Sequence, residues 1–158
     1  MEHLFQQVIG LLNDTNYRFD VAQQHWMIRL PVEGLTGRFV SYLRILDLGQ
    51  LVMYSKHEAE VPISQRLNMA EFITRVNFGI VVGNFEMDFS DGEIRFKTSI
   101  DSQGEIVTNN VLTSLINANL ANMELYLPGI QVMMTGDVSP EEALELCQQQ
   151  IEEETVSD

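Results

Sequence analysis

Three carboxylates lie close together in the sequence, at Glu86, Asp88 and Glu93. Carboxylates are the residue type that general acid and base catalysis uses, but a catalytic pair also needs a positioned base or ligand beside it. No histidine or cysteine lies near these residues in the sequence. We therefore expect a solvated, charge-paired sheet surface here. The alternative is a small-molecule-binding protein or an unrecognised hydrolase that uses these hairpin carboxylates.

The other residue types that carry chemistry are scattered along the chain. His3, His25 and His57 stand alone, at no spacing typical of metal ligands, and Cys147 is the only cysteine and lies among acids. Residues 79–83 begin and end with Gly but lack the Lys and Ser or Thr of a phosphate-binding loop. The sequence therefore predicts no catalytic residue, no metal and no cofactor, and we expect a protein that is not an enzyme.

A predicted β-hairpin, centred on Asp91-Gly92, positions the three carboxylates. These two residues favour a two-residue type I′ turn, because Gly adopts a positive φ freely and Asp tolerates one. One face of the hairpin would then be apolar and the other charged, and a slip of one residue would mix the two faces. The predicted pairs are Phe89 with Ile94, Met87 with Phe96, Phe85 with Thr98, Asp88 with Arg95, and Glu86 with Lys97.

Length and composition indicate one globular domain. The chain has 158 residues, a single cysteine and hence no intrachain disulfide, and no run of about 18 apolar residues that could span a membrane. Its first residues, MEHLFQQV, do not form a basic region followed by an apolar stretch, so we expect no signal peptide. These features favour a cytoplasmic protein.

The charge distribution is strongly asymmetric. The net charge is −14, all nine Lys and Arg lie between Arg18 and Lys97, and residues 98–158 contain 11 Asp or Glu and no Lys or Arg. An acidic segment of this kind repels phosphate groups and anionic lipid surfaces. We therefore expect no binding to nucleic acid or to a membrane.

The first half of the chain predicts a helix followed by strands. Residues 2–13 have a helical apolar stripe, a short strand is expected at residues 17–21, and further strands follow in residues 26–30, 38–47 and 50–56. The strand in residues 38–47 has apolar side chains on both faces, which indicates that both faces are covered. The covering elements would be helices on one side, and either a long terminal helix or a second subunit on the other.

The second half adds more helices around the hairpin. A second helix is expected to begin at Ser64 as its N-cap and to bury one stripe, and Gly79 should follow its end. A third helix is expected to begin after Thr108, with a kink or break at Pro128, which has no N–H to donate. The capping box at residues 139–142 begins a short acidic fourth helix. The buried stripe of the second helix comprises Met69, Phe72, Ile73 and Val76.

Together these segments predict an α+β fold, an antiparallel sheet of about five strands with flanking helices, in the order α-β-β-β-α-β-β-α. We expect residues 1–138 to form a single domain and residues 139–158 to form a short acidic C-terminal helix and tail.

Several sequence blocks resemble the YbjN-type proteins, which are described as bacterial sensory transduction regulators. The resemblance covers roughly residues 1–150 and is most specific over residues 75–101. It implies a fold similar to that of type III secretion chaperones, usually a homodimer, and no catalytic residue is carried over. The blocks are RVNFG at 75–79, GNFEMD at 83–88, DGE at 91–93, RFKTS at 95–99, Asn119, YLP at 126–128, Gly136 and SPEEA at 139–143.

The residues and the resemblance together predict a non-enzymatic protein-interaction module. It would act as a homodimer, in the role of a chaperone-like adaptor or signalling regulator. Its unknown protein partner would bind as an extended segment along a sheet face or edge. We expect the dimer interface on the second helix, near Phe72 and Val76.

Overall fold

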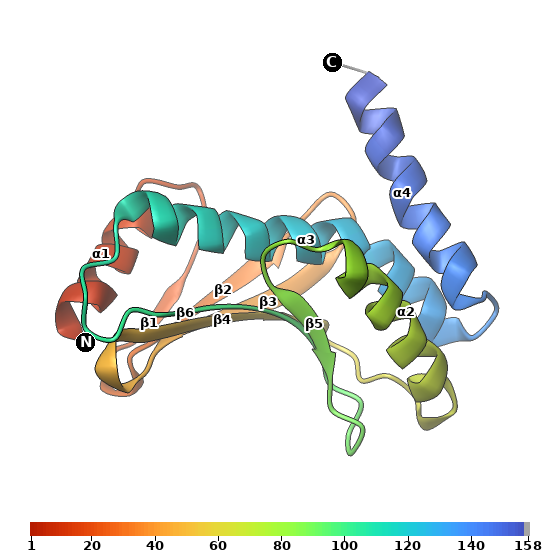
Figure 1. The fold of residues 1–158 in the computed structure, drawn as a ribbon, viewed down its shortest axis with the longest axis horizontal. Coiled ribbons are helices and arrows are strands. Elements are labelled where there is room, and N and C mark those ends of the chain that lie inside the picture. Colours follow the sequence, from red (N-terminus) through yellow and green to blue (C-terminus); the bar gives the residue numbers. More distant parts are fainter. Residues whose placement is uncertain (157–158) are drawn as a thin grey trace.

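Helices cover one face of an antiparallel sheet in the computed structural model (Figure 1). The structure describes the backbone of residues 1–156 and, except at position 48, the side chains of residues 1–149. The six strands are arranged in the order β1-β2-β3-β4-β6-β5. Their bounds are Asp20–Ala22 for β1, Met27–Glu33 for β2, Arg38–Ile45 for β3, Gln50–Lys56 for β4, Asn84–Met87 for β5 and Ile94–Asp101 for β6.

The four helices lie at different places on the sheet. α3 runs along the sheet over β4 and β6, α1 packs beside its beginning, and α2 and α4 pack together at the end near β5 (Figure 1). The helices are α1 (Glu2–Asn13), α2 (Arg66–Gly79), α3 (Asn109–Thr135) and α4 (Pro140–Val156). The predicted α+β fold is confirmed. The sheet has six strands rather than about five, and the short strand expected at residues 17–21 lies at residues 20–22 as β1.

Local signals place most helix ends correctly. The Thr108 hydroxyl accepts the Val111 N–H at the start of α3, and Ser139 and Glu142 exchange hydrogen bonds at the start of α4. The prediction for α2 was wrong at both ends. A short 3-10 turn, Ile63–Gln65, precedes it, and Gly79 is its last residue rather than a left-handed residue beyond it.

The predicted break at Pro128 is absent. α3 continues through this residue to Thr135. Proline removes the N–H that would bond the Glu124 carbonyl four residues earlier. The Thr36 hydroxyl, on the β2–β3 turn, donates to that carbonyl instead, at 2.8 Å. The helix is therefore supported by a turn that lies 88 residues away in the sequence.

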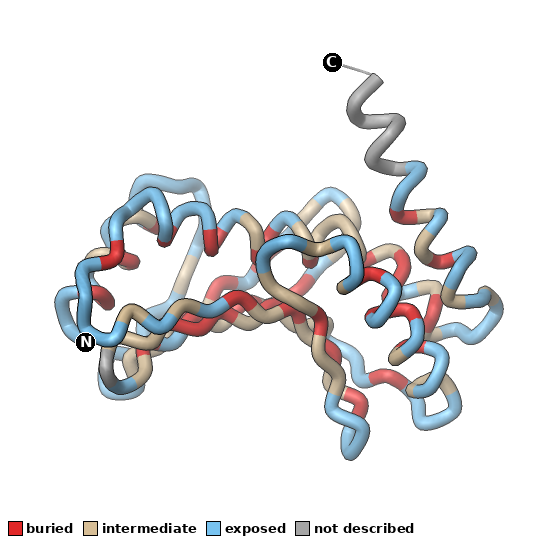
Figure 2. The backbone as a smooth tube through the Cα atoms, viewed as in Figure 1, coloured by how far each residue is buried: buried red, intermediate tan, exposed pale blue. Residues whose placement is uncertain are grey.

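The core lies between the helices and the sheet, as Figure 2 shows. One fully buried amide, that of Asn119 on α3, lies within it. Its oxygen accepts from the Ser55 hydroxyl, and its nitrogen donates to the Met53 carbonyl and the Thr98 hydroxyl. Because an unpaired buried amide would be costly, these bonds fix where α3 lies along β4 and β6.

The predicted hairpin is present, but its predicted register was wrong by two residues. Phe85 lies opposite Phe96, Glu86 opposite Arg95 and Met87 opposite Ile94. A shift of two residues leaves every side chain on its predicted face, so the apolar and charged faces survive. The loop is longer than a type I′ turn, because the Asp88 N–H and the Glu93 carbonyl form the last bond of the ladder.

Contacts made by three side chains explain the longer loop. The Asp88 carboxylate accepts from the Ser90 N–H at 2.8 Å, and the Asp91 carboxylate accepts from the Glu93 N–H at 2.8 Å. The Arg66 guanidinium, from the start of α2, donates to the carbonyls of residues 89, 90 and 91. A two-residue turn would leave the N–H groups of this guanidinium without their acceptors.

Candidate functional site

The face of the sheet opposite the helices has no cover among the described residues. The terminal helix, α4, does not cover it, because α4 packs against α2 and α3 on the helix side (Figure 1). We call this surface the open sheet face. Its central side chains come from neighbouring register positions on four strands: Met27 and Arg29 on β2; Val40, Tyr42 and Arg44 on β3; Val52, Tyr54 and Lys56 on β4; Arg95, Lys97 and Ser99 on β6.

The centre of the open sheet face is aromatic and apolar. Tyr42 and Tyr54 lie directly opposite each other across β3 and β4, and the Arg95 guanidinium lies 4.2 Å from the centre of the Tyr54 ring. Val40 and Val52 flank the tyrosines, and Val52 is only 7% exposed. Tyrosine and arginine are enriched in protein interfaces, where they combine apolar area with polar groups.

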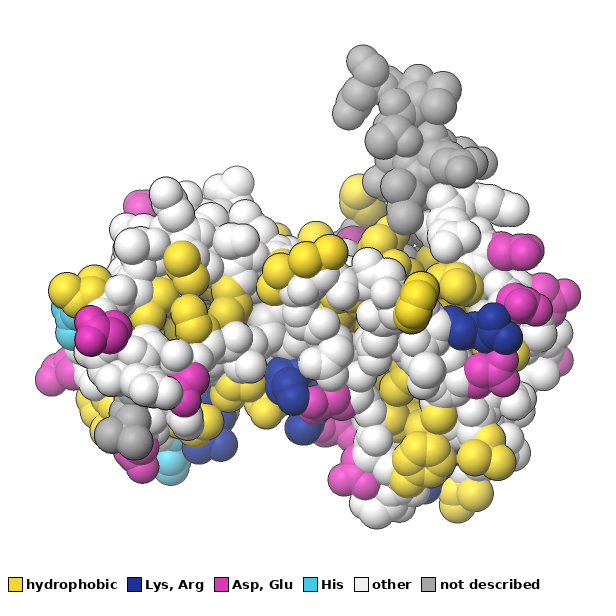
Figure 3. Space-filling model, viewed as in Figure 1, with side chains coloured by type: hydrophobic (Ala, Val, Ile, Leu, Met, Phe, Trp, Pro, Cys, Tyr) yellow, Lys and Arg dark blue, Asp and Glu magenta, His cyan; other side chains and the backbone are white. Residues whose placement is uncertain are grey.

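Six of the nine Lys and Arg residues of the chain point to this face, and Figure 3 shows such side chains along the lower side of the molecule. Five of these six cations pair with carboxylates: Arg29 with Asp20, Arg38 with Glu33, Lys56 with Glu93, Arg95 with Glu86 and Glu93, and Lys97 with Glu86. The sixth cation of this face is Arg44. The open sheet face is therefore close to neutral, whereas the molecule as a whole is strongly acidic.

The hairpin carboxylates are ion-paired or capping groups. Burial acts to raise the pKa of Glu86, but hydrogen bonds from Lys97 and Arg95 outweigh it, and the pKa is lowered. Hydrogen bonds from Ser90 lower the pKa of Asp88. A hollow of about 430 Å³ lies beside them, lined by Glu86, Met87, Asp88, Phe89, Asp91, Glu93 and Arg95. No histidine, cysteine or serine is among these lining residues, so a nucleophile or neutral base is missing.

The remaining residues considered from sequence do not gather into a site. Phe72 and Val76 are 0% and 2% exposed, because their side chains pack in the core, so they have no surface to offer to a second copy. Cys147 is fully buried on α4, and burial raises the pKa of its thiol. Within the described residues, no three His, Cys, Asp or Glu side chains form a group that could hold a metal ion.

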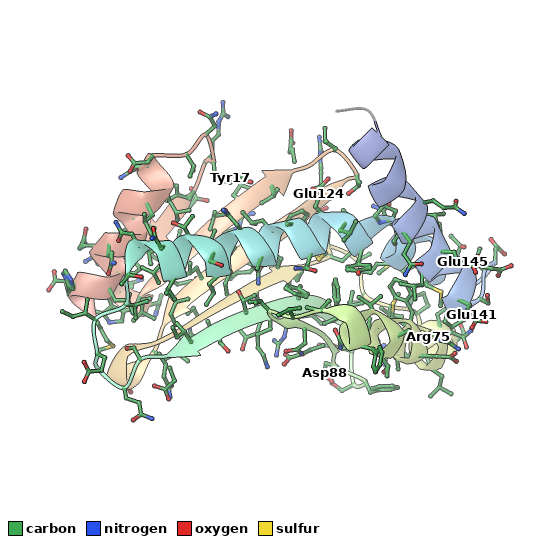
Figure 4. All side chains as sticks on the ribbon, turned by 45° about the horizontal axis from the view of Figure 1, so that its top comes forward. Tyr17, Arg75, Asp88, Glu124, Glu141 and Glu145 are labelled. Carbon is green, nitrogen blue, oxygen red and sulfur yellow. The ribbon has the colours of Figure 1, made fainter. Side chains whose placement is uncertain are left out.

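A second surface, missed from the sequence, lies at the outer edge of β2. We call it the β2-edge groove. It consists of two adjoining hollows, of about 780 and 350 Å³, which share Tyr17, Val32 and Glu33. Tyr17 and Glu124, which both line the smaller hollow, are labelled in Figure 4. Sequence patterns do not reveal it because its walls come from segments that are far apart in the chain: the α1–β1 connection, β2 with the β2–β3 turn and the start of β3, and α3.

Among the described helices, none is both long enough and apolar enough to cross a membrane.

Comparison with known proteins identifies the fold. No protein-family model matches the chain, and no curated protein matches it. Among solved structures, the crystal structure of YbjN from E. coli, which is described as a candidate transcription regulator, matches with a TM-score of 0.55 and 16% sequence identity. The match covers 84% of this chain and 90% of that chain. The resemblance inferred from the sequence blocks is thus confirmed at the level of fold: the chain has a YbjN-type fold.

Proposed function

We propose that this chain is a non-enzymatic protein-interaction module that acts as a homodimer, in the role of a chaperone-like adaptor or signalling regulator. The observation that carries the proposal is the open sheet face. It presents two half-buried central tyrosines beside Val40, and no segment of the described chain covers it. The description of the YbjN structure as that of a candidate transcription regulator supports a regulatory role over a catalytic one.

Charge favours a second copy on this face. Two molecules that each carry a net charge of −14 repel one another over most of their surfaces. On the open sheet face the repulsion is weakest, because six of the nine cations lie there and balance the local carboxylates. We therefore place the proposed interface around Val40, Tyr42 and Tyr54, and not at Phe72 and Val76.

Two other functions are less well supported. The cations of the open sheet face are mostly held by carboxylates, so few are free to neutralise phosphates, and we expect no nucleic-acid binding. Small-molecule binding or hydrolysis by the hairpin carboxylates lacks a base or nucleophile in the lining of that hollow. A cytoplasmic location and the division into residues 1–138 and 139–158 remain parts of the proposal.

Light scattering coupled to gel filtration tests the homodimer. At micromolar concentration we expect about twice the chain mass of 18.0 kDa. Val40→Glu, which adds a charge to the open sheet face, should give a folded monomer. Val111→Glu is the matched control, because Val111 is 42% exposed on α3, and it should remain a dimer.

Circular dichroism establishes that each variant is folded. A wild-type protein that is monomeric up to 100 micromolar, roughly the range of a weak specific interface, would overturn the homodimer. A Val40→Glu variant that is folded and still dimeric would overturn the choice of face.

A further inference from the structure

One stretch of β2 has no strand beside it on its outer edge. β1 pairs with β2 only at Met27, Ile28 and Arg29. If the same register continued, Arg18 would lie opposite Pro31, and Asn16 opposite Glu33. Pro31 has no N–H and cannot complete that ladder. The chain at residues 16–18 instead diverges from β2, and the larger hollow of the β2-edge groove opens between them.

The bare edge presents main-chain hydrogen-bonding groups. In an antiparallel pair, alternate residues of a strand bond to the neighbour on one side. The Ile45 N–H donates to the Trp26 carbonyl, and the Gly34 N–H donates to the Gly37 carbonyl. These bonds show that the main-chain N–H and carbonyl groups of the even-numbered residues of β2 point to β3. The carbonyl of Pro31 and both main-chain groups of Glu33 therefore point to the outer edge. An added extended segment could bond to these three groups.

The smaller hollow adjoins this edge and has an apolar floor. Its floor includes Phe39, Val32 and Leu120, which are 1%, 8% and 6% exposed. Leu35, at the rim, is 94% exposed. The walls are held in place because the Thr36 N–H donates to the Glu124 carboxylate on α3, at 2.7 Å, and the Thr36 hydroxyl donates to the Glu124 main-chain carbonyl, at 2.8 Å. The hollow is thus a fixed recess for one apolar side chain.

The charges around the groove select the partner. Glu33 and Glu124 line the smaller hollow, and no Lys or Arg is among its lining residues. Arg18 lines the larger hollow, and Arg38 pairs with Glu33, but both side chains of that pair are largely exposed, so a cation of the partner can replace Arg38. The net charge of −14 adds a long-range attraction for cations. A second copy of this acidic chain would be repelled here, whereas a basic segment would be attracted.

We propose that the β2-edge groove binds an extended segment of another protein, in which an aliphatic residue is flanked by Lys or Arg. The segment adds a strand to the Pro31–Glu33 edge, and its aliphatic side chain enters the recess over Phe39 and Leu120. Because alternate residues of a strand point to opposite faces, the flanking cations lie on the side of Glu33. This inference deepens the proposed function by naming the partner class, and its site is separate from the open sheet face.

Fluorescence anisotropy with a synthetic peptide tests it. The probe is a capped, fluorescein-labelled heptapeptide, Lys-Thr-Lys-Leu-Lys-Thr-Lys, titrated with the full chain. We expect saturable binding at micromolar protein. In an antiparallel added strand, the N–H groups that face Pro31 and Glu33 belong to the two Lys on either side of the central Leu. The affinity should fall at least tenfold when the central Leu is replaced by Ser, when those two Lys carry N-methyl groups, or when every Lys is replaced by Glu.

Two protein variants locate the site. Ala121→Leu fills the recess from an exposed position on α3 and should weaken binding at least tenfold, whereas Ser114→Leu, on the same helix but outside the lining, should not. Glu33→Lys should weaken the binding of the Lys peptide and strengthen the binding of the peptide in which every Lys is replaced by Glu. In hydrogen exchange, the Glu33 amide should be protected at least fivefold by the peptide.

The outcomes separate this inference from the homodimer. No binding of the Lys peptide at millimolar concentration, equal effects of Ala121→Leu and Ser114→Leu, or no loss on N-methylation would each overturn the groove proposal. Light scattering on the same samples reports the dimer independently. A dimer that does not bind the peptide would support the homodimer and overturn the groove proposal. A monomer that binds the peptide would support the groove proposal and overturn the homodimer.

Discussion

The hydroxyl of Thr36 donates to the main-chain carbonyl of Glu124, the group in α3 that Pro128 leaves without an intrahelical donor. The Thr36 N–H donates to the Glu124 carboxylate, which also lies 2.9 Å from the hydroxyl and shares its single proton with the carbonyl. One short turn therefore repairs the helix and anchors the end of β2 beside the β2-edge groove. The proline is tolerated in mid-helix because the sheet supplies the missing donor.

Thr36→Val should destabilise the protein by about 1–3 kcal/mol, because it removes the hydroxyl and leaves a partly buried carbonyl unpaired. The free energy of unfolding, from urea denaturation, measures the loss. Thr74→Val is the matched control, since its exposed hydroxyl bonds only the Ala70 carbonyl of its own helix. A double-mutant cycle with Pro128→Ala, which restores the intrahelical donor, should show a smaller cost of Thr36→Val. Equal costs in both backgrounds would contradict the role given to Thr36.

Asn119→Leu should cost at least about 2 kcal/mol, because the Ser55 hydroxyl and the Met53 carbonyl would lose a buried partner. Leucine keeps the branching of asparagine at Cγ but is larger, so overpacking of this buried site adds to the loss of the hydrogen bonds. Asn110→Leu, at an exposed position of the same helix, should change the stability by less than about 0.5 kcal/mol. Thermal unfolding followed by calorimetry measures both variants, and similar melting temperatures would show that the network contributes little.

Arg66→Lys should loosen the hairpin loop although the charge is kept. The guanidinium donates to the carbonyls of Phe89, Ser90 and Asp91 at 2.6–3.2 Å, and an ammonium cannot reproduce this fork. We expect amide exchange in residues 88–93 to become at least tenfold faster and the stability to fall by about 1–2 kcal/mol.

Arg75→Lys is the control for that experiment, because Arg75 bonds the surface carboxylates of Glu71 and Glu141, which a lysine can also reach. If Arg66→Lys left exchange in the loop unchanged, the loop conformation would have to come from Asp88 and Asp91 alone.

Glu86→Gln should make stability less dependent on pH. The pKa of Glu86 is lowered from its ordinary value of 4.5, so its ionised form stabilises the fold above that value and the contribution is lost as the pH falls through the lower, folded-state pKa. The variant should therefore be less stable than wild type by about 1 kcal/mol near neutral pH, and the difference should shrink below about pH 4.

Urea midpoints at pH 7, 5, 4 and 3 measure the pH effect of Glu86→Gln. Glu58→Gln, at an exposed position, is the control and should follow the wild-type curve. A difference between Glu86→Gln and wild type that stays constant down to pH 3 would exclude an ionic origin.

Signals that act within a few residues were readable in the sequence. The capping box at Ser139 and Glu142, the Thr108 cap and the buried stripe of α2 all depend on neighbours three or four positions away, and all are present. The two-residue period of the hairpin also assigned each of its side chains to the correct face, even though the register was wrong.

Tertiary contacts decided what lay beyond that range. The loop length of the hairpin depends on Arg66, and the continuity of α3 depends on Thr36, both far from the residues they hold. Phe72 was expected at an interface, but it is buried in the core. An apolar stripe in a sequence does not reveal whether its own chain or a second one covers it. Periodicity assigns side chains to faces. Which face stays bare, here the one with Tyr42 and Tyr54, is set only when the whole chain packs.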